Sequence, residues 1–223
     1  MRVLITTLLL MVAFGAMAQR GQRTGKPIKE DNLLVDLTYE SLGNQPAGVH
    51  FDFGFGASFQ LLYDHQFKVK TLSGAIGIGY SNANYYNNAM LLHKDSVLGD
   101  YAQFIPMPED SSYKRNKYVT NYFDIPVEIR YRSKPNSSGH SWKAAVGFKV
   151  GFRLGSHTHV VTDEGVYKDF IHPNLTRTRY GLSARVGYGR VGLSGYYSLS
   201  TLFEEGKGQR LVPWNVGITI SPF

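Results

Sequence analysis

His157 and His159 are the residues whose types and spacing come closest to a site for chemistry. Side chains two apart in a strand point the same way, so the pair could share a metal ion or serve as acid and base toward a lipid. Ser156 and Asp163 lie nearby, but a third ligand is not evident, and closeness in sequence does not place a nucleophile against a base. We therefore predict exposed loop histidines, with no catalytic residues, no metal and no cofactor, and keep a lipid-modifying enzyme as the less favoured alternative.

Charged residues recur on one side of several alternating segments. They are Asp36, Glu40, Asp52, Asp64, Asp124, Glu128, Arg130, Arg132, Lys143, Lys149, Arg153, Arg179 and Arg185. If the apolar side of these segments meets lipid, the charges must share a narrow interior, where an unpaired charge is strongly unfavourable. We predict a packed network of ion pairs in the lumen, and a narrow ion path or salt-bridge gate is the alternative that stays open.

The alternation has a period of two, which is typical of strands. Eight segments carry it, at residues 33–40, 51–64, 66–80, 123–132, 142–154, 179–188, 191–199 and 214–220. In the third segment the parity changes near Thr71, and Pro126 interrupts the fourth, so we expect a bulge at each place. The polar side is also rich in glycine, which suits the inside of a tight cylinder. These glycines are Gly54, Gly56, Gly147, Gly151 and Gly187.

Segment lengths and connections distinguish a membrane barrel from a soluble sandwich. Most segments reach the roughly 9–11 residues of a tilted strand that crosses a bilayer, whereas sandwich strands usually have about 5–6. The connections at 64–66, 133–140 and 189–190 are short, and those at 42–50, 81–120, 155–177 and 202–210 are long. This pattern predicts an all-β fold, an eight-stranded antiparallel up-and-down transmembrane β-barrel with periplasmic termini.

Aromatic residues gather near the expected strand ends, as the interfacial girdles of such a barrel require. They include Tyr63, Phe67, Tyr80, Tyr122, Tyr131, Trp142, Tyr180, Tyr188 and Trp214. The longest connection, at 81–120, carries Tyr85, Tyr86, Tyr101 and Phe104 beside acidic residues, which predicts an external contact surface or a mobile polar loop. A basic run at 114–117 could meet anionic lipid headgroups or stay solvated.

The N-terminus has the pattern of a cleaved secretory signal peptide over residues 1–18. Arg2 precedes an apolar run at 3–14, and Ala16-Met17-Ala18 stands before Gln19. Residues 19–31 are polar, basic and rich in glycine, which predicts a flexible periplasmic segment before a barrel domain at 32–223. Removal of residues 1–18 takes Arg2 from the formal net charge of +7 and leaves +6 outside the cytoplasm, so we expect no nucleic-acid partner. The absence of cysteine excludes disulfides and thiolate metal sites.

Four stretches resemble the PorT-like outer-membrane β-barrel proteins common in Bacteroidetes. They are YFDIPVEIRYRSKP at 122–135, AAVGFKVGF at 144–152, YGLSARVGYG at 180–189 and YYSLSTLFEEGKG at 196–208. The resemblance extends over the mature chain and implies an eight-stranded barrel in the bacterial outer membrane, in a family that usually has no assigned biochemical activity. The family name comes from a component needed for a secretion system, a role that architecture alone does not transfer.

These observations together predict a non-enzymatic outer-membrane protein with a plugged lumen. We expect it to act as an envelope scaffold or to bind through its extracellular loops. Outer-membrane lipid is the expected surrounding partner, and envelope or secretion proteins are candidate partners of the loops or of the N-terminal segment. An accessory role in protein secretion across the outer membrane is the alternative that the resemblance suggests.

Overall fold

The computed structural model describes residues 32–51, 53–94, 101–108, 111–170 and 174–221. The signal peptide predicted at 1–18 and the periplasmic segment predicted at 19–31 lie outside these ranges, as does Asp52. Within the described ranges, no helix is long and apolar enough to cross a membrane.

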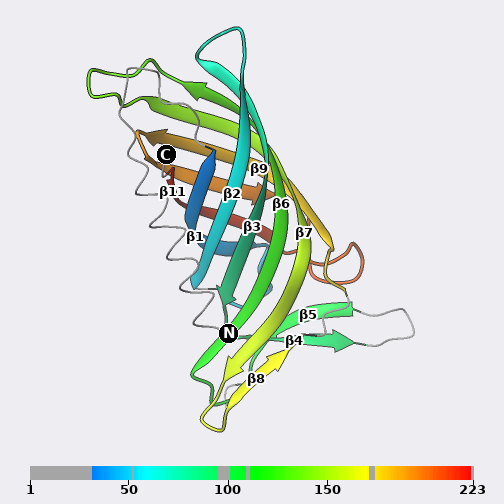
Figure 1. Ribbon diagram of the computed structural model, residues 1–223. Coiled ribbons are helices and arrows are strands. Elements are labelled where there is room, and N and C mark those ends of the chain that lie inside the picture. Colours follow the sequence, from blue (N-terminus) through cyan, green and yellow to red (C-terminus); the bar gives the residue numbers. More distant parts are fainter. Residues whose placement is uncertain (1–31, 52, 95–100, 109–110, 171–173, 222–223) are drawn as a thin grey trace, which may run out of the picture.

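Strands of the described chain close into a ring of eight (Figure 1). They are β1 (Leu33–Gly43), β2 (Phe53–Gln66), β3 (Leu72–Tyr86), β6 (Arg115–Arg132), β7 (Trp142–Val161), β9 (Thr178–Tyr188), β10 (Val191–Ser198) and β11 (Val212–Ile220). Each pairs antiparallel with both of its neighbours in the ring, and the pairing of β1 with β11 closes it. A closed ring satisfies the backbone groups that lipid cannot hydrogen-bond. The predicted eight-stranded antiparallel barrel is confirmed.

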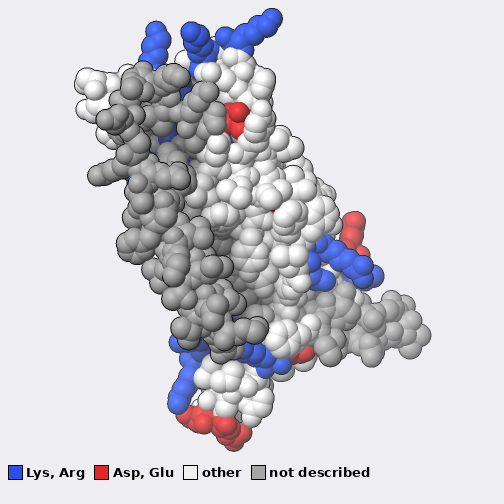
Figure 2. All heavy atoms as spheres, in the orientation of Figure 1, with Lys and Arg blue, Asp and Glu red and all other residues white. Residues whose placement is uncertain are grey.

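The two faces of the barrel wall differ as the alternation predicts. Large apolar side chains on the outer face are exposed, for example Phe59 at 44% and Val146 at 63%, while Asp124 on the inner face is 1% exposed. Figure 2 shows the same division, because most of the visible wall is white and Lys and Arg gather at the two ends. For tilted strands, the exposed row from Phe53 to Tyr63 covers about 25 Å of height, which matches the lipid-facing band of outer-membrane barrels.

The two ends of the barrel are built differently (Figure 1). At the short-turn end the connections are residues 67–71, 133–141 and 189–190, and at the long-loop end they are 44–52, 87–114, 162–177 and 199–211. The long connections carry further strands. β4 (Ala89–Lys94) and β5 (Tyr101–Pro106) form a hairpin, and β8 (Val166–Asp169) pairs with the end of β7. Short turns thus lie at one end and long loops at the other, as predicted.

The turn between β2 and β3 corrects the predicted start of the third strand. β2 runs through Gln66, so the connection predicted at residues 64–66 belongs to the strand. The chain turns at residues 67–71, where the Phe67 N–H donates to the Leu72 carbonyl and the Leu72 N–H donates to the Val69 carbonyl. The change of parity near Thr71 therefore comes from a turn, and the bulge predicted there is wrong.

Pro126 lies buried in β6 without a shift of register. The β3 partners of β6 keep the same offset at Val127 and at Asp124, on both sides of the proline. On the β7 side, Pro126 lies opposite Lys149 within an unbroken register. The bulge predicted at Pro126 is therefore wrong, because the ladder continues past the missing N–H without inserting a residue.

A register shift does occur between β6 and β7, nearer to the long-loop end. Asn121 lies opposite Gly155 and Tyr122 lies opposite Arg153, so Leu154 has no opposite residue. Because successive side chains alternate between the faces of a strand, the extra residue changes the parity of the residue numbers that face outward in β7 beyond it. Even-numbered residues of β7 point outward up to Leu154, and odd-numbered residues point outward from Gly155.

Most of the aromatic residues predicted for the girdles lie on the outer surface. Those exposed there are Tyr63, Phe67, Tyr80, Tyr131, Trp142, Tyr180 and Tyr188. Trp214 is partly exposed and packs against Tyr39, with 6.0 Å between ring centroids. Tyr122 is an error in the prediction, since it is 4% exposed and shares the inward parity of Asp124 in β6.

Candidate functional site

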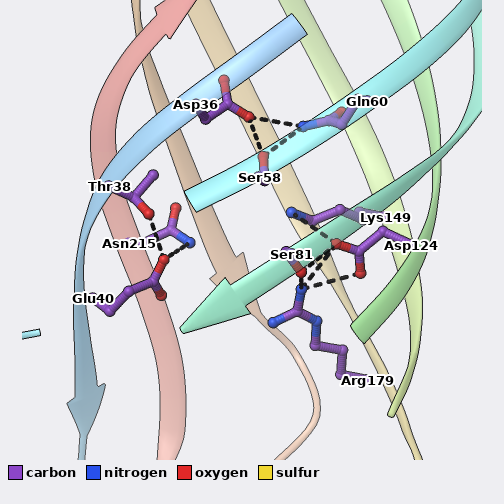
Figure 3. Close-up of polar contacts among 10 residues, drawn as sticks. All are labelled: Asp36, Thr38, Glu40, Ser58, Gln60, Ser81, Asp124, Lys149, Arg179 and Asn215. Carbon is purple, nitrogen blue, oxygen red and sulfur yellow. Dashed lines mark hydrogen bonds and ion pairs between the residues drawn. The ribbon is translucent and has the colours of Figure 1, made fainter. Parts of the chain in front are cut away.

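An ion-paired cluster around Asp124 fills the middle of the barrel (Figure 3). Both carboxylate oxygens of Asp124 on β6 lie 3.0 Å from Nη2 of Arg179 on β9. The Ser81 hydroxyl on β3 donates to the carboxylate at 2.6 Å, and Nζ of Lys149 on β7 lies 3.9 Å away. Arg179 also donates to the Ser81 hydroxyl oxygen at 2.6 Å. Four adjacent strands thus hold one cluster.

Two inward-facing tyrosines cover the cations of this cluster. The guanidinium carbon of Arg179 lies 3.8 Å from the ring centroid of Tyr122 and 5.3 Å from that of Tyr196. Nζ of Lys149 lies 4.4 Å from the Tyr196 centroid. A cation over an aromatic face is stabilised by roughly 0.5–2 kcal/mol, with the larger values in desolvated sites. The buried cations are therefore compensated by rings as well as by a carboxylate.

A second cluster surrounds Glu128, nearer to the short-turn end. Its carboxylate lies 2.9 Å from Nε of Arg130 and 3.1 Å from Nη1 of Arg185. Nη1 of Arg130 lies 3.4 Å from Asp64, and Nη2 of Arg132 lies 3.6 Å from the same carboxylate. Predicted lumen residues from β2, β6 and β9 therefore meet here as ion pairs.

Two further acids, Asp36 and Glu40 of β1, are held by neutral donors (Figure 3). Both are buried, and the sequence predicted ion pairs for them. A carboxylate accepts hydrogen bonds from hydroxyl and amide groups as well as from cations, and here neutral donors bind one oxygen of each carboxylate, Oδ2 of Asp36 and Oε1 of Glu40. The donors are Ser58 and Gln60 for Asp36, at 2.6 and 2.8 Å, and Thr38 and Asn215 for Glu40, at 2.6 and 3.0 Å.

The remaining predicted lumen residues lie toward the ends of the barrel. Arg153 of β7 is partly buried on the long-loop side of the Asp124 cluster. Lys143 and Arg132 line a hollow of about 540 Å³ at the short-turn end, together with Lys70. Asp52 is outside the described residues, so it is not placed in the lumen.

Glycines leave the space that the lumen charges occupy. A Cβ at Gly151 would overlap the Asp124 carboxylate and the Arg179 side chain, and one at Gly56 would overlap Glu40. A cavity of about 30 Å³ lies between Glu40, Lys149 and Arg179. That volume suits two or three water molecules at roughly 10–15 Å³ each. The glycines on the polar side therefore make room for a filled interior.

An apolar core closes the barrel at the long-loop end, and we call the loops that form it the loop cap. Phe104 of β5 lies at its centre, with ring centroids 5.3 Å from Phe51, 5.7 Å from Tyr118 and 5.9 Å from Phe203. Phe104 and Tyr85 are buried here, which corrects the prediction that they belong to an external contact surface. The buried core comprises Leu42, Val49, Phe51, Ala83, Tyr85, Ala89, Ala102, Phe104, Tyr118, Leu175, Leu202, Phe203 and Leu211.

Side-chain amides tie the loops of the cap to one another. Gln209 accepts a hydrogen bond from the Phe104 N–H at 2.9 Å and donates one to the Phe104 carbonyl at 3.1 Å. Asn88 accepts from the His50 N–H at 2.8 Å and donates to the Gly48 carbonyl at 3.1 Å. Three of the long connections are thereby joined, so the cap is one packed unit.

Comparison with protein families agrees with this architecture. Residues 37–204 match the family model described as the outer membrane protein beta-barrel domain. The chain belongs to this family. A search of the curated proteins found no match. The matched residues include most of the barrel wall, both charge clusters and most of the loop cap, so these features form part of an outer membrane β-barrel.

His157 and His159 lie on the outside of this outer membrane β-barrel, in the extension of β7, although the sequence predicted them in a loop. The His157 ring packs on Phe170, with 5.3 Å between centroids. Ser156 alternates to the opposite face, and Asp163 pairs with Lys114. Among the residues that the structure describes, no three His, Asp or Glu side chains are grouped so that they could hold a metal ion.

Sequence reasoning missed several residues that complete the lumen of the outer membrane β-barrel. They are the inward-facing tyrosines Tyr122 and Tyr196 and the neutral donors Thr38, Ser58, Gln60, Ser81 and Asn215. Strand parity could have found most of them. Tyr122, for example, is two residues from Asp124 and therefore shares its face. The prediction counted only charged residues in the lumen and assigned Tyr122 to an aromatic girdle, so it did not use this parity.

Proposed function

We propose that this outer membrane β-barrel is a closed, non-enzymatic scaffold that presents its loop cap at the cell surface for binding. One observation carries the proposal: the long loops form a single packed unit on top of a barrel whose interior is filled by paired charges. In bacterial outer-membrane barrels the short turns face the periplasm and the long loops face outward. That rule assigns the loop cap to the extracellular side.

Closure of the barrel argues against a conducting function. An ion that crossed the lumen would have to pass Asp124, Arg179 and Lys149, which are buried against one another. It would then meet the apolar core around Phe104. Separating a buried ion pair and placing an ion in an apolar core are both costly by several kcal/mol. Eight strands also leave an interior only wide enough for side chains to fill.

The order within the cap favours binding. Loops that merely connect strands need no shared core, yet these are joined by the Gln209 and Asn88 hydrogen bonds and by the packing of Phe104. A partner that docks on a preorganised surface loses less conformational entropy than one that must order the loops. We infer that the outer surface of the cap is the contact surface for an extracellular or envelope partner.

The assignment as non-enzymatic rests on the placement of the residues best suited to chemistry. His157 and His159 point outward beside Lys117 and Lys168, away from the lumen. Ser156 faces the other way, and Asp163 is engaged by Lys114 at 2.5 Å. A nucleophile, a base and an orienting acid are therefore not brought together by these residues.

An accessory role in protein secretion is a narrower form of the same proposal. The stretches that resemble PorT-like proteins fall on β6, β7, β9 and β10 and on the loop that follows β10. A secretion accessory would use the loop cap or the N-terminal segment to hold other envelope proteins. Affinity purification from detergent-solubilised membranes compares the intact chain with one in which a short turn replaces residues 87–114. Secretion components should be recovered with the intact chain alone if the loop cap holds them, and with both chains if the N-terminal segment holds them.

Two measurements test the proposed function. In planar lipid bilayers we expect no stable, large conductance, and a stable open level would contradict the closed barrel. In intact cells, a photo-crosslinking residue at exposed Glu205 on the cap should yield adducts with a partner, whereas one at exposed Lys134 at the short-turn end should not. Adducts from the residue at Lys134, with none from the residue at Glu205, would contradict the proposal and would show that the partner binds at the short-turn end.

A further inference from the structure

A row of basic side chains crosses β6, β7 and β8 at the long-loop end. Lys117 of β6 lies opposite His159 of β7, and His159 lies opposite Lys168 of β8. Arg115 is two residues from Lys117 in the same strand and shares its face. We call Arg115, Lys117, His159 and Lys168 the basic stripe.

The basic stripe faces outward, toward the surroundings of the barrel. The same cross-strand row continues from Lys117 to Tyr86 of β3 and from Tyr86 to Phe53 of β2. Residues opposite each other in an antiparallel ladder share a face, and Phe53 is 57% exposed on the outer wall. Nζ of Lys117 lies 5.8 Å from the Tyr86 ring centroid and 2.8 Å from Oδ1 of Asn84, which keeps it on that face.

Cations meet across the strands of this row without a carboxylate among its described members. Lys117 and Lys168 flank His159 at two strand spacings from each other, a backbone separation of about 10 Å. Of the nearby acids, Asp163 pairs with Lys114 and Asp169 alternates to the opposite face from Lys168, while Glu164 lies in the turn at residues 162–165, beyond the row. The two lysines carry like charges on either side of His159 and repel each other, so an anion that bridges them would stabilise the arrangement.

The stripe lies just beyond the lipid-facing band. Phe123 on β6 and Leu154 on β7 are the last large exposed apolar residues of the wall before the polar Asn121. Lys117 is four residues past Asn121, about 10 Å farther along the barrel axis in a tilted strand. The exposed Phe170, at 65%, adds apolar surface beside the stripe. Figure 2 shows Lys and Arg atoms at this lower end of the barrel, where β6, β7 and β8 lie in Figure 1, and Asp and Glu atoms below them at the tip.

We propose that the basic stripe is a binding site for the phosphate groups of an anionic membrane lipid in the leaflet at the long-loop end. The Lys117 and Lys168 ammonium groups donate to one phosphate from two sides, and the Arg115 guanidinium can donate two parallel hydrogen bonds to a phosphate. The acyl chains of the same lipid lie against the apolar wall near Phe123 and Leu154. This combination of charge above and apolar surface below selects a lipid over a soluble anion.

The test uses the folded full chain in phosphatidylcholine nanodiscs that contain a small fraction of bisphosphorylated lipid A. Native mass spectrometry counts the lipid A molecules that stay bound, and parallel discs contain lipid A without its phosphates. We expect retention of the phosphorylated form alone. The variant R115Q/K117Q/K168Q should bind it about 100-fold more weakly, since each basic side chain at a membrane surface contributes about fivefold.

The matched control is K68Q/K134Q/R190Q, which removes three exposed cations at the short-turn end. It should bind within about twofold of the unchanged protein, because the distant charges do not reach the lipid. Equal retention of dephosphorylated lipid A, or equal loss in the control, would overturn the proposal. If the triple variant does not show the heat-dependent gel shift of a folded barrel, K168Q alone should still lower binding about fivefold. These readouts count bound lipid and do not depend on a protein partner of the loop cap, so failure of this proposal is distinguishable from failure of the proposed binding function.

Discussion

The lumen and the loop cap both bury side chains, but they do so with opposite chemistry. In the lumen, the inner faces of regular strands bring together Asp124, Arg179 and Lys149. In the cap, loops far apart in sequence bring together apolar residues such as Phe51 and Phe104. The outer faces of the strands already supply the apolar surface that lipid requires, which leaves the polar faces for the interior. Beyond the lipid, the loops form an apolar core as a water-soluble domain does.

This difference predicts how each region fails. A buried ion pair that loses one member leaves a desolvated charge inside the barrel wall, so the whole ring is destabilised. An apolar core that loses a ring is left with a cavity, and its cost falls on the loops that surround it. Lumen substitutions should therefore lower the stability of the barrel, and cap substitutions should loosen the loops on a barrel that stays folded.

The largest effect is expected for D124N, compared with D36N. D124N removes the counter-charge of Arg179 and Lys149 and should lower the free energy of unfolding by about 3–5 kcal/mol. D36N changes an acid that is held by neutral Ser58 and Gln60, so the loss should be about 1 kcal/mol. Urea unfolding in vesicles, followed by tryptophan fluorescence, measures both. Equal losses would show that the pairing at Asp124 has no special weight.

F104A should open the loop cap without unfolding the barrel. Removing this ring from between Phe51, Tyr118 and Phe203 costs about 3 kcal/mol of local stability. Limited proteolysis should then cut the long loops, while the heat-dependent gel shift of the folded barrel persists. F170A, which removes an exposed ring, is the control and should leave the loops resistant. Loss of the gel shift in F104A would mean that cap and barrel fold as one unit.

Gly151 and Gly155 of β7 differ in the space around them: Gly151 faces the filled lumen, and Gly155 lies in open space nearer to the long-loop end. In G151A the new methyl group overlaps Asp124 and Arg179, which should cost about 1–3 kcal/mol. In G155A the methyl group meets no atom within 4 Å, so stability should stay within about 0.5 kcal/mol of the unchanged protein. The same urea titration compares them. A neutral G151A would indicate that the lumen charges can rearrange freely.

The smallest effect is expected at the surface of the cap, where Lys207 Nζ lies 2.7 Å from Glu204. The hydrogen bond from Lys207 holds the pKa of Glu204 below its usual value. A lowered folded-state pKa adds stability above the unfolded pKa, and this is lost as the pH falls through the folded value. Because both groups are exposed, E204Q should cost about 0.3 kcal/mol or less at neutral pH. Proteolysis rates of the cap from pH 7 to pH 3 should converge for the two proteins at the acidic end.

Much of the barrel could be predicted from sequence, because lipid imposes a simple rule on each strand. Phe53 to Tyr63 alternates so regularly that its exposed and buried faces follow from parity alone. The prediction of strand faces failed where a turn or an extra residue changed the alternation. The sequence predicts a bulge near Thr71 where the chain turns at residues 67–71, and the register shift beside Leu154 has no signal in the composition.

The lumen and the cap were predictable to different degrees. The inward position of Asp124 and Glu128 follows from alternation, but their partners depend on which strands are neighbours across the barrel. The cap could not be derived, because its core joins residues as distant as Phe51 and Phe203. Loop residues carry no periodic pattern that reveals such contacts. Tyr85 and Phe104, within residues 81–120, are buried, whereas the sequence predicts an external contact surface or a mobile polar loop there.

The unpaired Leu154 makes the outer rim of the barrel tolerant of losing one residue. Deleting Leu154 would join inward-facing Arg153 directly to outward-facing Gly155, so regular alternation would be restored. His157 and His159 would still point outward, and Ser156 and Thr158 would keep their β6 partners. Homologous barrels can therefore differ by one residue at this height and still present the same surface chemistry.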